Sequence, residues 1–226
     1  MEGLAAFWNS TDGVGRAVVV ILLAMSIAAW VVILWKGWVL GRAARDIERA
    51  IPAFWDAASL DDGRLRLRAL DREQLLAPLL DAAAARPGAG TLETAGRTES
   101  QLTRRLRDAL HRGLAHLQSG QVLLASVGST APFVGLFGTV WGIYHALVAI
   151  AAAGSVTIDK VSGPVGEALI MTAAGIAVAI PGVLGYNIFG QRIAACEAEL
   201  EGFAHDLREM VLDSGRAEPT APSPPA

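Results

Sequence analysis

The chain has 226 residues, of which 53% are hydrophobic and 18% charged, with 24 glycines and a formal net charge of −3. This composition is too apolar for an ordinary soluble domain, so it predicts a membrane protein. The near balance of acidic and basic residues supplies no strongly positive field, which argues against nucleic acid as a partner. The single cysteine, Cys196, excludes an internal disulfide and any cysteine-rich metal site.

Stretches without charge locate the expected membrane-spanning helices, because a charge in hydrocarbon is costly and about 20 apolar residues cross a bilayer. The first stretch runs from Ala17 to Trp35, and we expect the first spanning helix over residues 17–38. The segment before it carries Glu2 and Asp12 instead of the basic start of a signal peptide. The sequence therefore predicts a retained span that follows a short segment, residues 1–16.

A second uncharged stretch, Gly113 to Ile158, is 46 residues long, which is more than one crossing requires. We expect a spanning helix over residues 122–153, a short outer turn over 154–162 and a third spanning helix over 163–190. Glu167 is the only charged residue of that third helix. The fold class predicted from these spans is an all-α integral membrane protein with three transmembrane helices.

Basic residues near the ends of the spans predict the orientation. Of the 19 lysines and arginines, 14 lie between Lys36 and Arg112, so we expect this loop to be cytoplasmic. The amino terminus and the turn at 154–162 then face outward, and the carboxyl terminus returns to the cytoplasm.

The cytoplasmic parts have helical periodicity. Over residues 39–121 we expect a helical loop and stalk, which includes an amphipathic helix from Arg64 to Ala85 that Arg86–Gly90 interrupts. Residues 191–214 continue the third span as a helix with heptad spacing, and residues 215–226 form a disordered tail. In the stalk before the second span, the apolar face consists of Leu102, Leu106, Leu110, Leu114 and Leu117. In the helix over residues 191–214, it consists of Ile193, Cys196, Leu200, Phe203, Leu207 and Met210.

Small residues recur along both later spans, which allows helix backbones to approach closely in lipid. A tightly packed helix bundle explains this pattern, and Pro181 is expected to kink or loosen the third span. The second span carries Gly128, Gly135, Gly138, Gly142 and Ala149, and the third carries Ala168, Thr172, Gly175, Ala179 and Gly182.

Glu167 is the main candidate for chemistry, because an ionised carboxylate facing lipid is costly. It should face a partner helix or a wet cavity, or be protonated; the alternative is an interfacial glutamate about one turn into the helix. Thr139 and Thr172 are candidate polar groups, although such threonines commonly only bond back to their own helix. Thr172 lies about 140° around the helix from Glu167, so the two should meet different neighbours. For His145 the two interpretations are a titrating group and a packing histidine.

Two stretches of the later spans resemble the paired signature of the ExbB/TolQ/MotA family of bacterial inner-membrane proton-channel subunits, most closely its ExbB branch. They are APFVGLFGTVWGIYHAL (131–147) and GPVGEALIMTAAGIAVAIPGVLGYN (163–187). The resemblance implies a homopentamer whose second and third spans line a central pore. That pore would hold the spans of ExbD, a small partner with an essential membrane aspartate, and proton flow would energise TonB-dependent import of iron-siderophores or vitamin B12.

The resemblance also assigns roles to individual residues. Glu167 matches the family's third-span glutamate, and Thr139 and Thr172 match its pore-lining threonines. We expect only a helix-packing role for Gly135, Gly138, Gly142, Gly175 and Pro181. We expect no catalytic residue, no metal and no cofactor, with protons as the coupling ion and lipid around the spans.

Three other functions stay open at this point. A TolQ-like subunit would serve the Tol-Pal envelope system, and an inert membrane scaffold would only recruit partners through its cytoplasmic helices. A membrane enzyme would need a convergent polar cluster within the spans.

Overall fold

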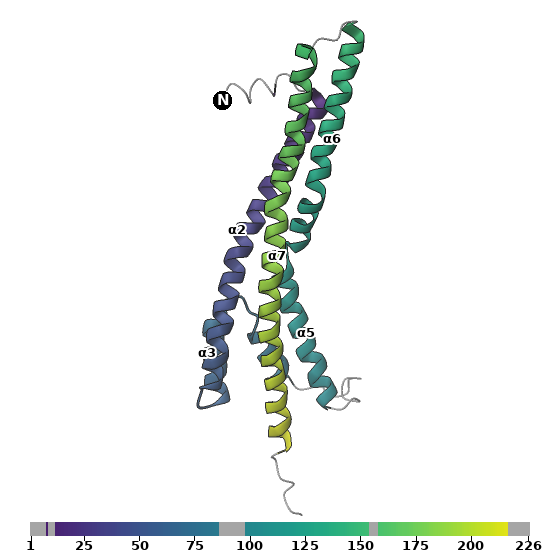
Figure 1. The fold of residues 1–226 in the computed structure, drawn as a ribbon. Helices are drawn as coiled ribbons and strands as arrows, with labels where there is room; N and C mark the ends of the chain where they lie inside the picture. The colour runs from purple at the N-terminus through teal and green to yellow at the C-terminus, as the bar shows by residue number, and fades with distance from the viewer. Residues whose placement is uncertain (1–7, 9–11, 86–97, 154–157, 217–226) are drawn as a thin grey trace, which may run out of the picture. The chain divides into compact units, whose positions relative to one another are not determined.

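A computed structural model describes residues 8, 12–85, 98–153 and 158–216. All regular structure in this part of the chain is helical, as the sequence predicted (Figure 1). The helices are α2 (Gly13–Trp55), α3 (Leu60–Leu70), α4 (Ala77–Ala84), α5 (Thr98–Gln118), α6 (Gln121–Ala153) and α7 (Ile158–Arg216). The break expected at Arg86–Gly90 and the tail from residue 217 lie outside the described residues.

Three helices, α2, α6 and α7, are long and apolar enough to cross a membrane, so the chain is a multi-pass membrane protein. Only 17%, 22% and 33% of the most apolar windows of these helices are buried within the chain. Their large side chains instead point outward, for example Leu34 on α2, Phe133 on α6 and Ile170 on α7. A surface of this kind is stable against lipid or against other apolar helices, but not against water.

The chain divides into two compact units. The span unit comprises the chain up to Gly37 together with Gly120–Gly190. The charged unit comprises Trp38–Ser119 and the chain from Gln191, and it holds 34 of the 41 charged residues. Helices α2 and α7 contribute to both units, whereas α6 belongs to the span unit.

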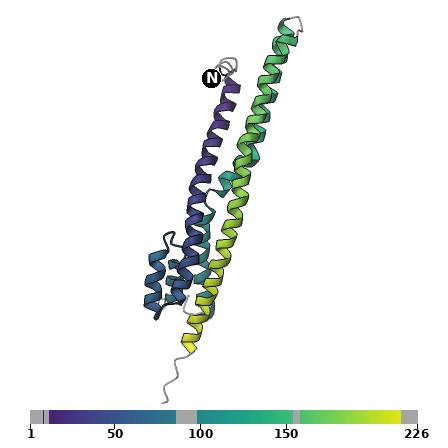
Figure 2. The same cartoon turned by 60° about the vertical axis from the view of Figure 1, so that its left-hand side comes forward.

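Within the span unit, α6 lies beside the first half of α7 (Figures 1 and 2). The small-residue stripes of the two helices face each other at backbone contact distance. A Cβ atom on Gly135 would lie 2.5 Å from the carbonyl oxygen of Met171, and one on Gly175 would lie 2.6 Å from that of Ala131. Only glycine permits this approach, which brings the polar backbone and hydroxyl groups of the two helices together.

Pro164 and Pro181 both lie inside α7, which is continuous from Ile158. The helix therefore begins within the stretch expected as the outer turn, and residues 154–157 lie outside the described part. A turn also separates α5 from α6, where Gly120 has a positive φ of 80°. Glycine adopts this left-handed conformation without the strain that a side chain would bring. The chain can therefore end α5 and begin α6 at this residue.

In the charged unit, the apolar face expected on residues 102–117 is confirmed, because all five leucines are buried. The heptad face on α7 is buried from Ile193 to Leu207, and Met210 is half-buried. Phe203 of this face meets Phe54 of α2 edge-on, with ring centroids 5.5 Å apart. The core of this unit therefore includes a contact between α2 and α7, while α5 packs against α4.

The single helix expected over residues 64–85 is wrong, because the chain breaks it into α3 and α4. The Asp71 carboxylate accepts hydrogen bonds from the backbone N–H groups of Leu75, Leu76 and Ala77, at 2.9, 2.9 and 2.7 Å. These bonds cap the start of α4. Gln74, which lies between Asp71 and Leu75 in the chain, has a left-handed φ of 54°. The sequence carries two signals for this break that the prediction did not use: four polar residues, Asp71 to Gln74, interrupt the apolar pattern, and Pro78 lies in the first turn of α4.

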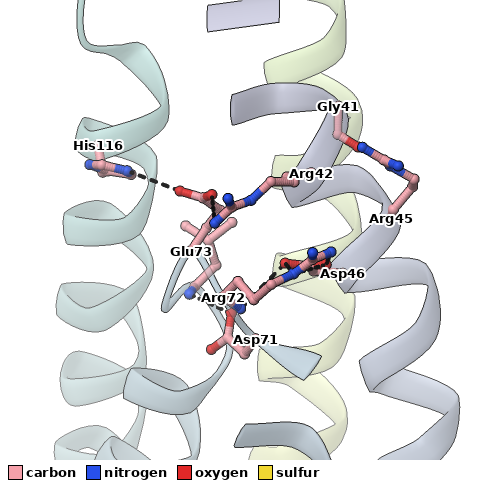
Figure 3. Close-up of polar contacts among 9 residues, drawn as sticks. Gly41, Arg42, Arg45, Asp46, Asp71, Arg72, Glu73 and His116 are labelled. Atoms are coloured by element: carbon pink, nitrogen blue, oxygen red, sulfur yellow. Dashed lines mark hydrogen bonds and ion pairs between the residues drawn. The ribbon is translucent and has the colours of Figure 1, made fainter. Parts of the chain in front are cut away.

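Ion pairs fix the loop between α3 and α4 to its neighbours in the charged unit (Figure 3). Arg72 contacts the buried carboxylate of Asp46 on α2, with Nη2 2.6 Å from Oδ1. This hydrogen-bonded pairing raises the pKa of the Arg72 guanidinium. The next residue, Glu73, lies 2.9 Å from Arg42 of α2 and 3.7 Å from His116 of α5. The loop is thus held from two helices at once.

Candidate proton-path site

Two threonine hydroxyls meet at the contact between α6 and α7. The hydroxyls of Thr139 and Thr172 are hydrogen-bonded to each other. The Thr139 oxygen also lies 3.1 Å from the carbonyl oxygen of Gly135 on its own helix and 3.3 Å from that of Ala168 on α7. A hydroxyl has one proton and two lone pairs, so Thr139 can accept from Thr172 while it donates to a carbonyl. The pair, which we call the threonine bridge, is a polar link between two otherwise apolar helices.

Glycine makes this bridge possible. Gly135 lies one turn before Thr139, and a Cβ atom there would come within 3.1 Å of the Cα atom of Thr172. Thr139 is buried, with 7% of its surface exposed. The small-residue stripe and the hydroxyl pair are therefore one structural feature, because close backbone approach brings the hydroxyls within bonding distance.

Glu167 is half-buried and lines an open cavity of about 210 Å³ within the span unit. Thr172 is not among the residues that line this cavity. We call this cavity the vestibule. Its walls are formed by Asp12, Gly15, Gly138, Trp141, Gly142, His145, Ala146, Ala149, Pro164, Glu167, Ala168 and Met171.

The vestibule adjoins the threonine bridge. Ala168 lines its wall, and the carbonyl oxygen of the same residue lies 3.3 Å from the Thr139 hydroxyl. Gly138 and Met171, which also line it, directly precede Thr139 and Thr172 in the chain. The three residues selected from the sequence are thus brought to one region, the carboxylate in the vestibule and the hydroxyls beside it.

Asp12 and Trp141 are vestibule residues that sequence reasoning did not select. Oδ2 of Asp12 accepts a hydrogen bond of 2.7 Å from Nε1 of Trp141, and Oδ1 accepts one of 2.8 Å from the backbone N–H of Gly15. The Trp141 bond is the main cause that lowers the pKa of the Asp12 carboxyl. The only sequence signal is an aspartate directly before an apolar helix, and helix capping explains that equally well.

His145 is exposed on the chain surface and is not packed inside it. Its ring lies 4.6 Å from the Trp141 ring, and Nδ1 lies 3.3 Å from the carbonyl oxygen of Trp141. The histidine is thus positioned at the vestibule wall by contacts with a single neighbouring turn.

Lys36 is not the exposed flanking charge that its place at the end of an apolar stretch suggests. Its residue surface is 2% exposed within the span unit. No cluster of three or more metal-ligating side chains occurs among the described residues.

A family model for the MotA/TolQ/ExbB proton channel family matches residues 71–202. The chain belongs to this family. Its relatives include the Biopolymer transport protein ExbB of Xanthomonas campestris, which is 44% identical over 95% of this chain and 89% of that protein. The ExbB of Neisseria meningitidis is 37% identical over 93% of this chain and 97% of that protein.

The same family includes a relative with another name. The Tol-Pal system protein TolQ of Haemophilus influenzae is 31% identical over 87% of this chain and 88% of that protein. The matched region begins at the α3–α4 loop and ends in the distal part of α7. It therefore contains the threonine bridge and Glu167, but not Asp12.

Proposed function

We propose that the chain is an ExbB-like subunit of a proton-driven stator in a bacterial inner membrane. With an ExbD-like single-span partner it energises a TonB-like transducer, and so supports uptake of iron-siderophores or vitamin B12. Membership of a proton channel family and the ExbB relatives that match over nearly the whole chain support this function. Protons are the coupling ion, and the subunit needs no cofactor and turns over no substrate.

The observation that carries the proposal is the adjacency of the vestibule and the threonine bridge. Glu167 lines the cavity whose wall includes Ala168, and the carbonyl of Ala168 lies beside the Thr139 hydroxyl. A carboxylate can take up and release a proton, and a hydroxyl can donate and accept hydrogen bonds without carrying a net charge. In the proposed stator these groups form the polar lining against which the partner's membrane aspartate exchanges its proton.

Assembly and orientation form part of the proposal. We propose a homopentamer, in which copies of the chain and lipid cover the outward-facing apolar side chains of α2, α6 and α7. The basic residues between Lys36 and Arg112 support an orientation with the charged unit and the carboxyl terminus in the cytoplasm and the amino terminus in the periplasm.

The test replaces the proposed groups and separates function from assembly. Glu167→Ala and Thr172→Val should each abolish growth on a siderophore as sole iron source, with protein level and oligomer unchanged. Thr130→Val is the matched control, because its exposed hydroxyl donates to the Ser126 carbonyl of the same helix. Normal growth of both site variants would overturn the proton path and favour the scaffold.

Native mass spectrometry of the gently extracted complex tests the assembly, since 23.6 kDa subunits are easy to count. Five copies with a single-span partner would support the stator. A monomer or dimer that lacks such a partner would contradict it.

The TolQ relative supports one other candidate, a subunit of the Tol-Pal envelope system. A deletion strain distinguishes the two. Loss of siderophore-dependent growth with intact envelopes indicates the ExbB role, and leaky envelopes with normal iron uptake indicate the TolQ role.

A further inference from the structure

The vestibule contains acid–base groups from α6, from α7 and from the residue directly before α2. Asp12 precedes α2, Trp141 and His145 lie on α6, and Glu167 lies on α7. The threonine bridge needs none of Asp12, Trp141 and His145 for its geometry. A role as helix packing does not explain them either, because Asp12 and His145 are both exposed.

We propose that His145 is a proton-transfer group that loads Glu167 from the outer solvent, that Trp141 holds its ring in position, and that Asp12 supplies a fixed negative charge nearby. This inference rests on the proposed proton channel and adds the entry step to it. His145 and Glu167 both line this open cavity, and the entry step requires that it hold water in the assembled channel.

The contacts of the imidazole assign its two nitrogens. Nδ1 lies 3.3 Å from the carbonyl oxygen of Trp141, an acceptor only, so the neutral ring keeps its proton on Nδ1 and donates it there. Nε2 is then the basic atom. It takes a proton from solvent to form imidazolium and passes that proton to the Glu167 carboxylate, directly or through one water. The ring returns to its neutral form with the Nδ1 proton in place, and Glu167 becomes a neutral acid.

Asp12 contributes a fixed negative charge at the same wall. The indole N–H of Trp141 and the backbone N–H of Gly15 hold its carboxylate ionised, since both bonds favour the charged form. The nearby histidine acts in the same direction on the pKa of Asp12, after the larger effect of Trp141. A carboxylate that stays ionised attracts cations to the mouth of the vestibule and does not itself keep the proton.

The other titratable or charged groups nearby have separate contacts. Arg16 of α2 donates through Nε to the carbonyl oxygen of Trp8, and its guanidinium lies 5.6 Å from the centroid of the Trp8 ring. Tyr144 of α6 packs edge-on against His145, with centroids 5.3 Å apart. On α7, the vestibule residue that titrates is Glu167.

The experiment measures proton flux into liposomes that contain the full-length chain purified with its single-span partner, as a function of outer pH. Wild-type flux should depend on outer pH, because the proposed entry step needs the His145 imidazole in both of its protonation states. His145→Gln should remove that dependence and lower the flux about tenfold. That loss is smaller than the roughly 100-fold typical of positioned proton donors, because cavity water replaces the ring in part.

Two further variants identify the cause. Trp141→Phe keeps an aromatic ring but removes the donor to Asp12, and it should give a smaller loss with an altered pH profile. His205→Gln is the matched control, because His205 lies on the exposed surface of α7 in the charged unit, 3.3 Å from Glu209. It should leave both flux and pH profile unchanged.

The outcomes separate this inference from the proposed channel. If the wild-type complex conducts no protons, or if Glu167→Gln conducts normally, the proposed path itself fails. If the wild type conducts, Glu167→Gln does not, and His145→Gln matches the His205→Gln control, the channel stands and the entry role of His145 is refuted.

Discussion

Replacing Gly175 with alanine tests whether close contact between α6 and α7 sustains the threonine bridge. The new Cβ atom would lie 2.6 Å from the carbonyl oxygen of Ala131, whereas ordinary contacts of this type begin near 3.4 Å. The clashing atom belongs to the backbone, so no side chain can rotate away. The helices must therefore separate by about 0.8 Å at this point or shift along each other.

Two effects of Gly175→Ala lower the free energy of unfolding, and one smaller effect raises it. Overpacking of this kind typically costs about 1–3 kcal/mol. Separation also stretches the 3.3 Å contact between Thr139 and the carbonyl of Ala168 beyond hydrogen-bonding distance, and such an interhelical bond is worth about 0.6 kcal/mol. Alanine recovers roughly 0.5–1 kcal/mol of helix propensity. The net loss of stability is about 0.6–3 kcal/mol.

Gly166→Ala is the matched control, because it lies on the same helix and a Cβ atom there would meet nothing within 4 Å in the described part of the chain. Thermal unfolding in detergent should separate the two variants by about 5 °C, with Gly175→Ala the lower. Gly175→Ala should also lose proton flux. Equal melting temperatures and normal flux in both variants would refute the argument that backbone contact builds the site.

Two predictions concern the charged unit. Asp71→Ala should lower the free energy of unfolding by about 1–2 kcal/mol, since three backbone N–H groups at the start of α4 lose their acceptor. Asp61→Ala, at a side chain that is 95% exposed, should change it little, and equal effects of the two would contradict the capping role. Cys196 is 5% exposed, and burial raises the pKa of its thiol, so N-ethylmaleimide should label the native protein slowly at pH 7 and quickly after denaturation. Rapid labelling of the native protein would show that this part of α7 is not packed as described.

The sequence by itself determined the three spans and the buried faces of the charged unit. Both depend on local features of the sequence. The spans follow from uncharged stretches, because charges are costly in hydrocarbon. The buried face of Leu102 to Leu117 follows from helical spacing, whichever helix packs against it. The sequence also selected Glu167, Thr139 and Thr172, since polar groups are costly in lipid and the surrounding motifs resemble those of a proton channel family.

Only the tertiary structure decided which of these groups meet. Thr139 and Thr172 lie 33 positions apart and touch because Gly135 and Gly175 let two backbones come together, a pairwise property that neither helix encodes alone. Asp12 is a capping residue in the sequence, and it becomes part of a cavity only when Trp141, 129 positions away, donates to it. The break at Asp71 is local, because its carboxylate binds backbone N–H groups only four to six positions further on. The tertiary structure decided instead that Arg72 and Glu73 beside it pair with Asp46 and Arg42 of α2.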